Sequence, residues 1–415
     1  MTLLARLRRP FHELGPGLIT GAADDDPSGI ATYSQAGAQF GYGMLWSVVF
    51  TLPLMAAIQI VSARIGYVSG RGLAANMKRT FPRPVLLALV GLLLAANTLN
   101  IAADIAAMSS ALHMLVGGPA LIYAIAFGVV SVLMQVFLAY QSYVRWLKWL
   151  TLALLAYVGV VIVLGLDWGE VLLHTIRPEL KWNRDTVLML VALFGTTISP
   201  YLFFWQAGQE VEDCAGRPCK PADVKRHLRR IKLDTHVGMG FSNLIAFCIM
   251  LSTAVTLHAA GVHDIQTSAQ AIEALRPIAG EHAALLFSLG IIGTGMLAVP
   301  VLAGSAAYAV AEVAGWRDSL SLKLERGEGR GFYSVIAVAT LGGVALCFAP
   351  LDPVKALFWS AVFNGISAVP IMAAMMVLAT RESVMGEHVI GPRLRRMGWA
   401  ATGVMALTAL ALALV

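Results

Sequence analysis

The chain has 415 residues, of which 58% are hydrophobic and only 13% charged, and its formal net charge is +6. Soluble domains carry about one quarter charged residues, so this chain has too few charges to cover a surface that faces water. Its Lys and Arg residues fall between apolar stretches, as membrane topology requires, and this placement argues against a nucleic-acid-binding protein. The composition therefore predicts a membrane protein whose partner is the lipid bilayer.

Apolar stretches of about 20 residues recur along the chain, and each is long enough to cross a hydrocarbon core of about 30 Å. A segment in lipid must satisfy its own backbone groups, so only helices or a closed barrel are possible. The period-two alternation of barrel strands is missing from this sequence. We therefore predict an all-α polytopic membrane protein with eleven spans, at 14–38, 42–66, 83–108, 119–139, 145–166, 187–211, 234–258, 281–313, 332–349, 354–379 and 397–415.

Basic residues occupy every second loop between these predicted spans. By the positive-inside rule, the N-terminus is expected in the cytoplasm and the C-terminus outside, with the protein in a bacterial-type inner (plasma) membrane. The segment 220–232 is predicted to form a short basic amphipathic helix on the inner surface.

Two of the predicted spans are interrupted near half depth. Three aspartates, Pro27 and several glycines interrupt the first, and the sequence GTTISP, which ends at Pro200, interrupts the sixth. Proline removes a backbone donor and pushes the preceding residue out of helical geometry. An unwound stretch at the midplane is tolerated only where it lines a cavity. Paired interruptions in corresponding spans are typical of a transporter's binding site.

These two spans correspond if a unit of five helices repeats, and the odd number of helices inverts the second copy in the membrane. The first repeat is predicted at about 14–166 and the second at about 187–379, with an extra helix at about 397–415. The whole chain is expected to form one transporter domain.

The acids at the first interruption form the densest charge cluster inside any span: Asp24, Asp25 and Asp26. A charged side chain at the centre of a bilayer costs about 2.5–3.5 kcal/mol on insertion scales. An extracellular loop between two shorter helices is the alternative, but the flanking stretches are too short to span. We expect Asp26 to be functional. Of the other two, we expect one to line the vestibule and the other to face solvent or cap the outer half-helix.

The sixth span offers further oxygen atoms from Thr196 and Ser199, which are spaced i, i+3 and share one helix face. The alternative is that each hydroxyl merely bonds to the carbonyl four residues earlier.

Two other spans carry polar stripes that either line a cavity or bond between helices. Asp104 stands out, because a carboxylate inside a span is a functional candidate by default. The nine histidines show no clustering at the interruptions. The stripes are Asn97, Asn100 and Asp104 in the third span, and Ser360, Asn364 and Ser367 in the tenth.

Three stretches of the sequence resemble a known family of membrane transporters. The stretch GPGLITGAADDDPSGIATYSQAGAQFGYGMLW resembles the first span of the Nramp metal-ion transporters, and its QAGAQFGY segment, Gln35–Tyr42, matches the family pattern directly. GTTISPYLFFWQ resembles the sixth-span GATVMPHNLYLH in spacing, and AADIAAMSSALHMLVG resembles the third-span TDLAEVIG. The likeness runs over most of the chain and is weakest in the eighth to tenth spans. It implies a LeuT-like fold and alternating access between two inverted five-helix repeats.

The resemblance implies a metal site at the two interruptions. Asp26 falls on the family's metal-binding aspartate, and Thr196 falls on the alanine whose carbonyl reaches the metal. Gly29 stands where the family has an asparagine ligand, and Ser199 where it has the methionine that selects soft metals. With Ala23 at the first interruption, these residues form the candidate metal-binding set.

The family's proton route is largely missing. Tyr201 and Gln206 replace two histidines, and Ala107 replaces a glutamate. Asp104 falls on the third-span aspartate of that route, while no arginine stands clearly inside the ninth span. The candidate cavity or proton-route set adds five residues to Asp104, Tyr201 and Gln206: Asp24, Asp25, Asn97, Asn100 and Asn364.

Carboxylates, carbonyls, hydroxyls and water suit hard cations, whereas thioether and imidazole suit softer metals. Mg²⁺ keeps several waters when one or two carboxylates bind it. The chain therefore looks most like the Nramp-related magnesium transporter branch, which implies a monomeric importer of hydrated Mg²⁺ and also Mn²⁺, without proton coupling and without a cofactor. The alternatives are a proton-coupled Mn²⁺/Fe²⁺ importer and, less favoured, an amino-acid transporter of the same fold. No enzyme motif is present.

Overall fold

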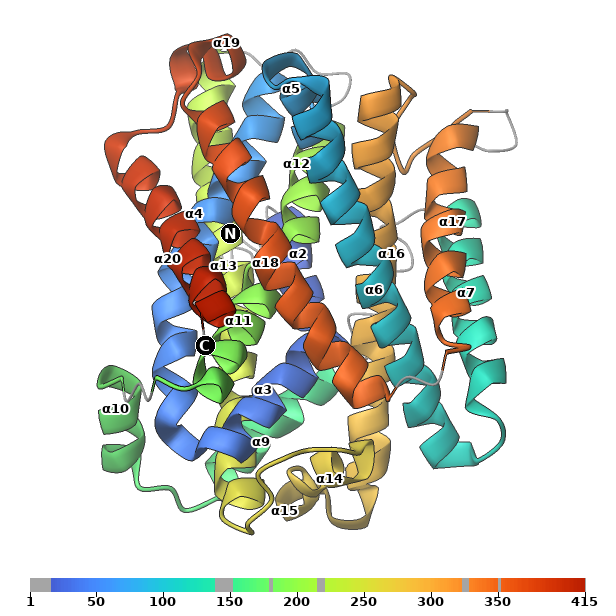
Figure 1. The fold of residues 1–415 in the computed structure, drawn as a ribbon, viewed down its shortest axis with the longest axis vertical. Coiled ribbons are helices and arrows are strands. Elements are labelled where there is room, and N and C mark those ends of the chain that lie inside the picture. Colours follow the sequence, from blue (N-terminus) through green and yellow to red (C-terminus); the bar gives the residue numbers. More distant parts are fainter. Residues whose placement is uncertain are drawn as a thin grey trace, which may run out of the picture.

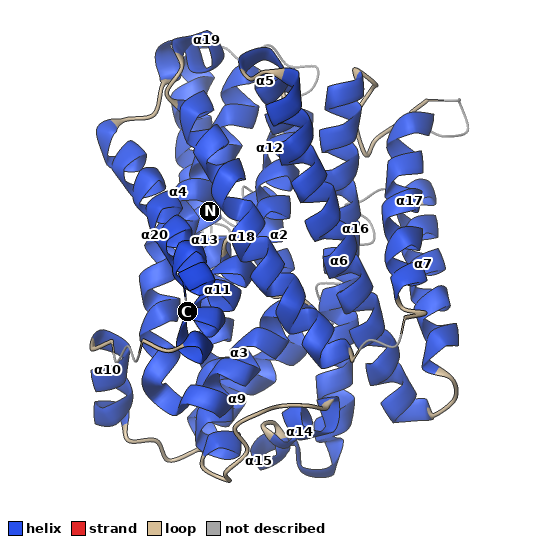
Figure 2. Cartoon of the chain, in the orientation of Figure 1, coloured by secondary structure: helices blue, strands red, loops and turns tan. Residues whose placement is uncertain are grey.

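The computed structural model describes residues 16–138, 152–178, 182–214, 221–322, 328–349 and 352–414. All regular elements in this part of the chain are helices (Figure 2). In chain order they are α2 (Pro16–Asp24), α3 (Pro27–Phe40), α4 (Leu45–Ser69), α5 (Leu73–Thr80), α6 (Arg83–Val116), α7 (Ala120–Phe137), α9 (Leu155–Val163), α10 (Trp168–Ile176), α11 (Arg184–Thr197), α12 (Pro200–Cys214), α13 (Pro221–Thr253), α14 (Ser268–Glu273), α15 (Arg276–Ala279), α16 (Ala283–Ala314), α17 (Arg330–Leu346), α18 (Pro353–Ala379), α19 (Glu382–Met385) and α20 (Pro392–Leu414).

The all-helical membrane fold predicted from composition is confirmed. Among the described residues, eight helical stretches are long and apolar enough to cross a membrane, or nine if the pair Leu152–Val163 and Trp168–Ile176, bent by 118°, counts as one span. This count is lower than the predicted eleven because Pro27–Ser69 is counted as one stretch and Arg330–Leu346 is short. Part of the predicted span 145–166 lies outside the described residues.

The long helices run between two ends of the molecule (Figure 1). We call them the α5 end, where α5 and α19 lie, and the α14 end, where α10, α14 and α15 lie. Between them, α6 packs against α16 and α18, and α11 packs against α18. Helix α13 contacts α2, α3 and α4, so it lies along both halves of the first span.

Both predicted helix interruptions are present. Helix α2 ends at Asp24 and α3 begins at Pro27, while α11 ends at Thr197 and α12 begins at Pro200. Proline is favoured at the first position of a helix because its missing N–H would have no partner there anyway. The two prolines therefore end one half-helix and start the next.

Helix α13 is longer than the sequence predicted. The basic segment expected as a separate short helix at 220–232 is instead the first part of this continuous helix, apart from Lys220, which lies outside the described residues. Helix α2 lies so close to α13 that a Cβ on Gly21 would stand 2.3 Å from the Gly238 carbonyl carbon. The repeat boundaries at 14–166 and 187–379, and the extra helix at 397–415, stay predictions.

Candidate metal-binding site

One side chain, Tyr201 at the start of α12, connects the second helix interruption to the first. Its hydroxyl donates to the Ala23 carbonyl at 3.0 Å and lies 3.4 Å from Asp26 Oδ2. Tyr201, Ala23 and Asp26 are all buried. A hydroxyl has one proton, so the shorter bond to Ala23 takes it. This contact brings an aspartate, a backbone carbonyl and a phenol oxygen together between α2, α3 and α12.

Asp26 uses only one of its carboxylate oxygens to hold the backbone. Oδ1 accepts hydrogen bonds from the Gly29 backbone N–H at 2.8 Å and from the Ser28 hydroxyl at 2.7 Å, so Asp26 is the N-cap of α3. Among the described residues, the hydrogen bond found for Oδ2 is the long one to Tyr201. The capped geometry fixes the carboxylate and leaves Oδ2 available to a cation.

Gly29 of α3 lies close to α11. A Cβ built on Gly29 would stand 3.2 Å from Thr196 Oγ1, 3.3 Å from Tyr33 Cε2 and 3.4 Å from the Asp24 carbonyl oxygen. The Thr196 hydroxyl is buried and lies near the Tyr33 phenol. The glycine therefore lets the two interrupted helices approach closely, and a larger residue there would press against these three atoms.

Ser199 turns its hydroxyl back onto its own helix. It donates to the Gly195 carbonyl at 2.8 Å and lies 3.0 Å from the Thr196 carbonyl. This is the alternative that the sequence left open for this residue. The Ser199 hydroxyl proton is shared between these two carbonyl oxygens. The lone pairs of the hydroxyl oxygen remain available to a cation or a water molecule.

Asp24 and Asp25 share one hydroxyl on α13. Ser242 Oγ lies 2.6 Å from Asp24 Oδ2 and 3.0 Å from Asp25 Oδ1. Both carboxylates are buried. Neither faces solvent or caps the outer half-helix, contrary to the expectation for one of them, because α13 covers this side of the break and Asp26 supplies the cap.

The polar stripe of α6 divides into a structural part and an unsatisfied part. Asn97 donates to the Leu302 carbonyl at 2.8 Å and to Ser305 Oγ at 2.7 Å, so it bonds between helices. The side-chain polar atoms of Asn100 and Asp104 are buried and have no partner in the described structure, and the same holds for Asn364 on α18. Buried polar groups without a protein partner generally hold water or an ion.

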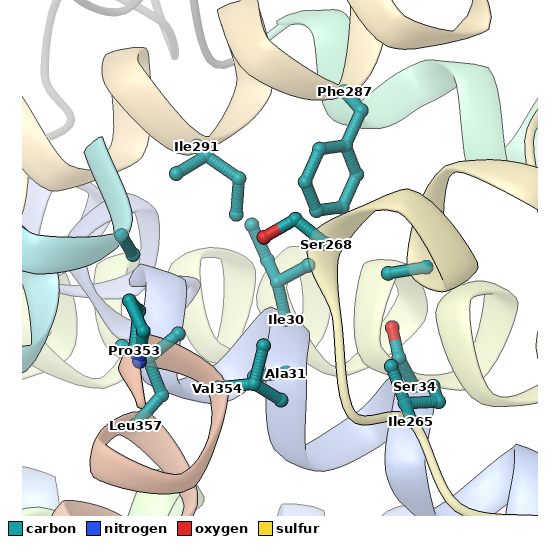
Figure 3. A pocket seen from close by; sticks show the side chains of 12 residues that line it. Ile30, Ala31, Ser34, Ile265, Ser268, Phe287, Ile291, Pro353, Val354 and Leu357 are labelled. Carbon is teal, nitrogen blue, oxygen red and sulfur yellow. The ribbon is translucent and has the colours of Figure 1, made fainter. Parts of the chain in front are cut away.

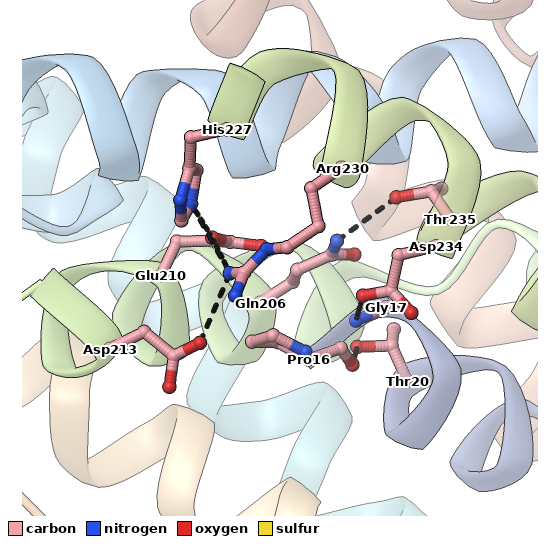
Figure 4. Close-up of polar contacts among 10 residues, drawn as sticks. All are labelled: Pro16, Gly17, Thr20, Gln206, Glu210, Asp213, His227, Arg230, Asp234 and Thr235. Atoms are coloured by element: carbon pink, nitrogen blue, oxygen red, sulfur yellow. Dashed lines mark hydrogen bonds and ion pairs between the residues drawn. The ribbon is translucent and has the colours of Figure 1, made fainter. Parts of the chain in front are cut away.

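A polar network closes the α5 end (Figure 4). Glu210 Oε2 lies 2.9 Å from His227 Nε2 and 3.3 Å from Arg230 Nη2, and Arg230 also pairs with Asp213 at 3.1 Å. These bonds join α12 to α13. Gln206 links α12 to α4 and α13 as well, since it accepts from Gln59 at 2.6 Å and donates to Thr235 at 3.1 Å.

The α14 end is hollowed instead (Figure 3). The hollow reaches Ile30 and Ala31, about one helical turn along α3 from Asp26. Its other walls come from Ile265, Phe287 and Leu357. The candidate site is therefore separated from the α14 end by a short apolar layer, and from the α5 end by a packed polar network.

The donors at the break favour a hard cation. No three His, Cys, Asp or Glu side chains in the described part of the chain are grouped as a metal cage. The side-chain contacts found for Asp26 in the described residues are the Tyr201 and Ser28 hydroxyls, and oxygen ligands of this kind suit Mg²⁺, Ca²⁺ and Mn²⁺.

Two contacts of this site could not be read from the sequence. Ser242 is one of many serines in apolar helices, and nothing in its spacing links it to the aspartates 217 or 218 residues away. The Tyr201 bond to Ala23 likewise joins residues 178 positions apart. Only the fold brings these residues together.

Known proteins resemble this chain over nearly its whole length. The family model described as "Nramp: Natural resistance-associated macrophage protein-like" matches residues 17–415. A divalent metal cation transporter MntH from Burkholderia ambifaria is 26% identical over 412 residues, covering 95% of this chain and 86% of that protein. The MntH of Mycobacterium leprae is 24% identical over 408 residues, covering 95% and 90%.

Solved structures share the fold. The manganese transporter of Eremococcus coleocola superposes with a TM-score of 0.76 at 16% identity, over 97% of this chain and 86% of that one. Mhp1, a nucleobase-cation-symport-1 family transporter captured in a closed conformation, gives a TM-score of 0.63 at 13% identity, over 96% and 91%. At these identities the similarity shows a shared fold and nothing more.

Proposed function

The chain belongs to the Nramp family, and from this membership we propose that it imports divalent metal cations, chiefly Mg²⁺ and also Mn²⁺, by alternating access. It is a multi-pass membrane protein and not an enzyme. The relatives named as divalent metal cation transporters cover nearly the whole chain, which supports the general class of substrate. The choice of ion rests on the residues at the two interruptions.

One observation carries the proposed ion preference: the hydrogen-bond partner found for Asp26 Oδ2 among the described residues is a hydroxyl oxygen, that of Tyr201. The Ala23 carbonyl, the Tyr201 hydroxyl and the Thr196 side chain surround the break, and no thioether or imidazole is among them. Mg²⁺ gives up its waters reluctantly and is usually bound by one or two carboxylates with several waters kept. A site with a single capped carboxylate fits an ion that stays largely hydrated.

Transport without protons is the second part of the proposal. By the family resemblance, Tyr201 and Gln206 replace two histidines that take part in proton movement. In this structure both side chains form hydrogen bonds to neighbouring helices. Neither side chain titrates near neutral pH as a histidine does. The chain therefore offers no imidazole for a relay between the two interrupted helices.

A proton-coupled Mn²⁺/Fe²⁺ importer is the second candidate, and one observation favours it. Asp104 is buried and neither of its carboxylate oxygens has a partner in the described structure. An unpaired carboxylate inside a membrane span is suited to taking up and releasing a proton.

The direction of access follows from orientation. We propose that the α5 end is cytoplasmic, because α5 carries Lys78 and Arg79 and α20 begins beside Arg393, Arg395 and Arg396. With that orientation in the inner membrane, the network of Figure 4 closes the inner side and the hollow of Figure 3 faces outward. The monomer contains both interrupted helices, so one chain suffices for the site.

The test is a flux assay in proteoliposomes that carry a lumenal ion indicator and a lumenal pH reporter. The proposal expects saturable uptake of Mg²⁺ and Mn²⁺ with no acidification beyond the leak of empty liposomes. Uptake of Mn²⁺ with acidification and without Mg²⁺ transport would establish the second candidate instead.

A further inference from the structure

A second group of metal-ligand atoms lies at the α14 end, away from the interrupted helices. The π-helical turn Ala254–His258 continues α13, and the loop after it carries His263. The Nδ1 atoms of His258 and His263 lie 3.2 Å apart. The Ala38 carbonyl oxygen of α3 lies 2.8 Å from the first Nδ1 and 3.4 Å from the second. Three donor atoms thus converge from two parts of the chain.

We propose that His258, His263 and the Ala38 carbonyl bind one borderline transition-metal cation of the Zn²⁺ type. Zn²⁺ binds histidine nitrogen at about 2.0–2.1 Å, so two nitrogens at the tetrahedral angle are held about 3.4 Å apart. The observed separation of 3.2 Å between the two Nδ1 atoms is close to this value. Imidazole is the ligand that such metals prefer, whereas the oxygen site at Asp26 suits hard ions.

The ring of His258 packs directly against the backbone of Gly41. This glycine has φ +55°, a conformation that side chains disfavour, and a Cβ there would stand 3.1 Å from Cδ2 and 3.2 Å from Nε2 of His258. Glycine therefore both turns the chain after α3 and leaves room for the ring. The position of His258 Nδ1 over the Ala38 carbonyl depends on that space.

Gln35 holds the loop of His263 against the same helix. Its Oε1 accepts from the Ile265 backbone N–H at 2.8 Å, and its Nε2 donates to the His263 carbonyl at 3.2 Å. The loop is thereby tied to α3 on both sides of Asp264. Although the His263 side chain is exposed, its backbone is already positioned, and less entropy is lost when it binds a metal.

The charge at this point favours a cation. Ala38 lies in the last turn of α3, where the helix dipole is negative. The unprotonated form of each ring is the one that binds, with its remaining proton on Nε2. In the unbound state, one Nδ1–H donates to Ala38. The pair is then an ordinary hydrogen-bonded contact, and a metal would replace that proton.

Binding here would act on transport, and this consequence rests on the proposed function. The ligands join α3, the outer half of the interrupted first span, to α13 and its following loop. A bound ion would favour the arrangement in which the three donors meet, which is the arrangement closed at the α5 end. External Zn²⁺ should therefore slow Mg²⁺ uptake by lowering its maximal rate, without competing at Asp26.

The test is Zn²⁺ titration calorimetry on purified protein from which any affinity tag has been removed. An Asp26→Asn background excludes binding at the transport site, so the result does not depend on the proposed function. We expect one Zn²⁺ per chain, and at least tenfold weaker binding in His258→Gln or His263→Gln because each variant removes one nitrogen ligand. His282→Gln, which removes an exposed histidine at the same end, is the matched control and should bind as the background does.

Equal Zn²⁺ affinity in His263→Gln and in the control would overturn the proposal and leave the two rings as a hydrogen-bonded pair only. His263 is exposed, so its replacement should not disturb folding, and size-exclusion profiles check this. Gln35→Leu gives an independent measurement: it should weaken Zn²⁺ binding by releasing the loop, although Gln35 itself offers no metal ligand in the proposed set.

Discussion

The Tyr201 hydroxyl bonds to the Ala23 carbonyl at 3.0 Å and lies 3.4 Å from Asp26 Oδ2, so one phenol spans both interrupted helices. The carbonyl comes from the last turn of α2 and the carboxylate caps α3. Any movement of α12 that carries Tyr201 away would change two candidate ligands at once. The site and the conformational change are therefore linked through a single side chain.

The first prediction concerns Asp26. Asparagine also caps helices, so Asp26→Asn should fold and keep the bond to the Gly29 backbone. It removes the charge, and we expect uptake of Mg²⁺ and Mn²⁺ to fall at least about tenfold, which corresponds to about 1.4 kcal/mol. Uptake into proteoliposomes measures this. Transport at the wild-type rate by a monodisperse variant would remove Asp26 from the site.

The second prediction concerns Tyr201. Tyr201→Phe keeps the ring but leaves the Ala23 carbonyl without its donor, and a hydrogen bond of this kind contributes about 1 kcal/mol. We expect the KM for Mg²⁺ to change by about fivefold while the protein remains folded. Tyr333→Phe is the control, because that hydroxyl bonds to the Leu322 carbonyl at 2.8 Å, outside the site. Equal effects of both variants would contradict a role for Tyr201 in positioning Asp26.

The third prediction separates the two candidate functions at Asp104. If transport is uncoupled, Asp104→Asn should leave Mg²⁺ uptake within about twofold of wild type, because asparagine keeps the size of the side chain while removing its titration. Uptake and lumenal pH are recorded together. Acidification in wild type that disappears in Asp104→Asn would instead assign this carboxylate to proton coupling.

The fourth prediction concerns ion selectivity. Ser199→Met with Gly29→Asn would supply the thioether and amide that the resemblance places there, and should shift preference from Mg²⁺ towards Mn²⁺ and Cd²⁺. The structure adds a condition, because a Cβ on Gly29 would stand 3.2 Å from Thr196 Oγ1. Adding Thr196→Ala removes that hydroxyl and keeps the backbone carbonyl.

Competition uptake compares the double and triple variants. We expect the triple variant to show the larger shift, because its asparagine no longer meets the Thr196 hydroxyl. A wild type that rejects Mg²⁺ at millimolar concentration while it binds Cd²⁺ tightly would contradict the oxygen-only site.

The fifth prediction concerns closure of the α5 end. Arg230 pairs with both Glu210 and Asp213, and hydrogen bonds to charged groups contribute about 1.5–3 kcal/mol. Arg230→Gln should therefore raise opening of α12 at least about tenfold, seen as faster amide hydrogen exchange in residues 200–214. The matched control is Arg276→Gln, which removes an exposed pair with Glu273 at the α14 end. Unchanged amide exchange in Arg230→Gln would show that the ion pairs of Arg230 do not hold α12 against α13.

The sequence predicted the helix interruptions well because proline and charge act locally. Pro27 and Pro200 each begin a half-helix, as their missing N–H requires. The contact of Asp24 and Asp25 with Ser242 cannot be predicted from the sequence, because it depends on the packing of α13, more than 200 residues away. The meeting of His258 and His263 was also hidden, since it requires a π-helical turn and a loop held by Gln35. Helix interruptions can be predicted from neighbouring residues, whereas contacts between residues far apart in the sequence become visible only in the folded structure.

The glycine contact between α2 and α13 bears on how the inner half of the first span could move. A Cβ on Gly21 would stand within 2.3 Å of Gly238, so the two helices touch backbone to backbone here. Neither glycine has a side chain to interlock at this point, so polar contacts on either side of it, such as Ser242 with Asp24 and Asp234 with the Gly17 backbone N–H, hold α2 to α13. Gly21→Ala would act as a wedge, holding α2 off α13 in the closed state. The close backbone contact between the two helices is thus also what limits the tolerance of Gly21 to mutation.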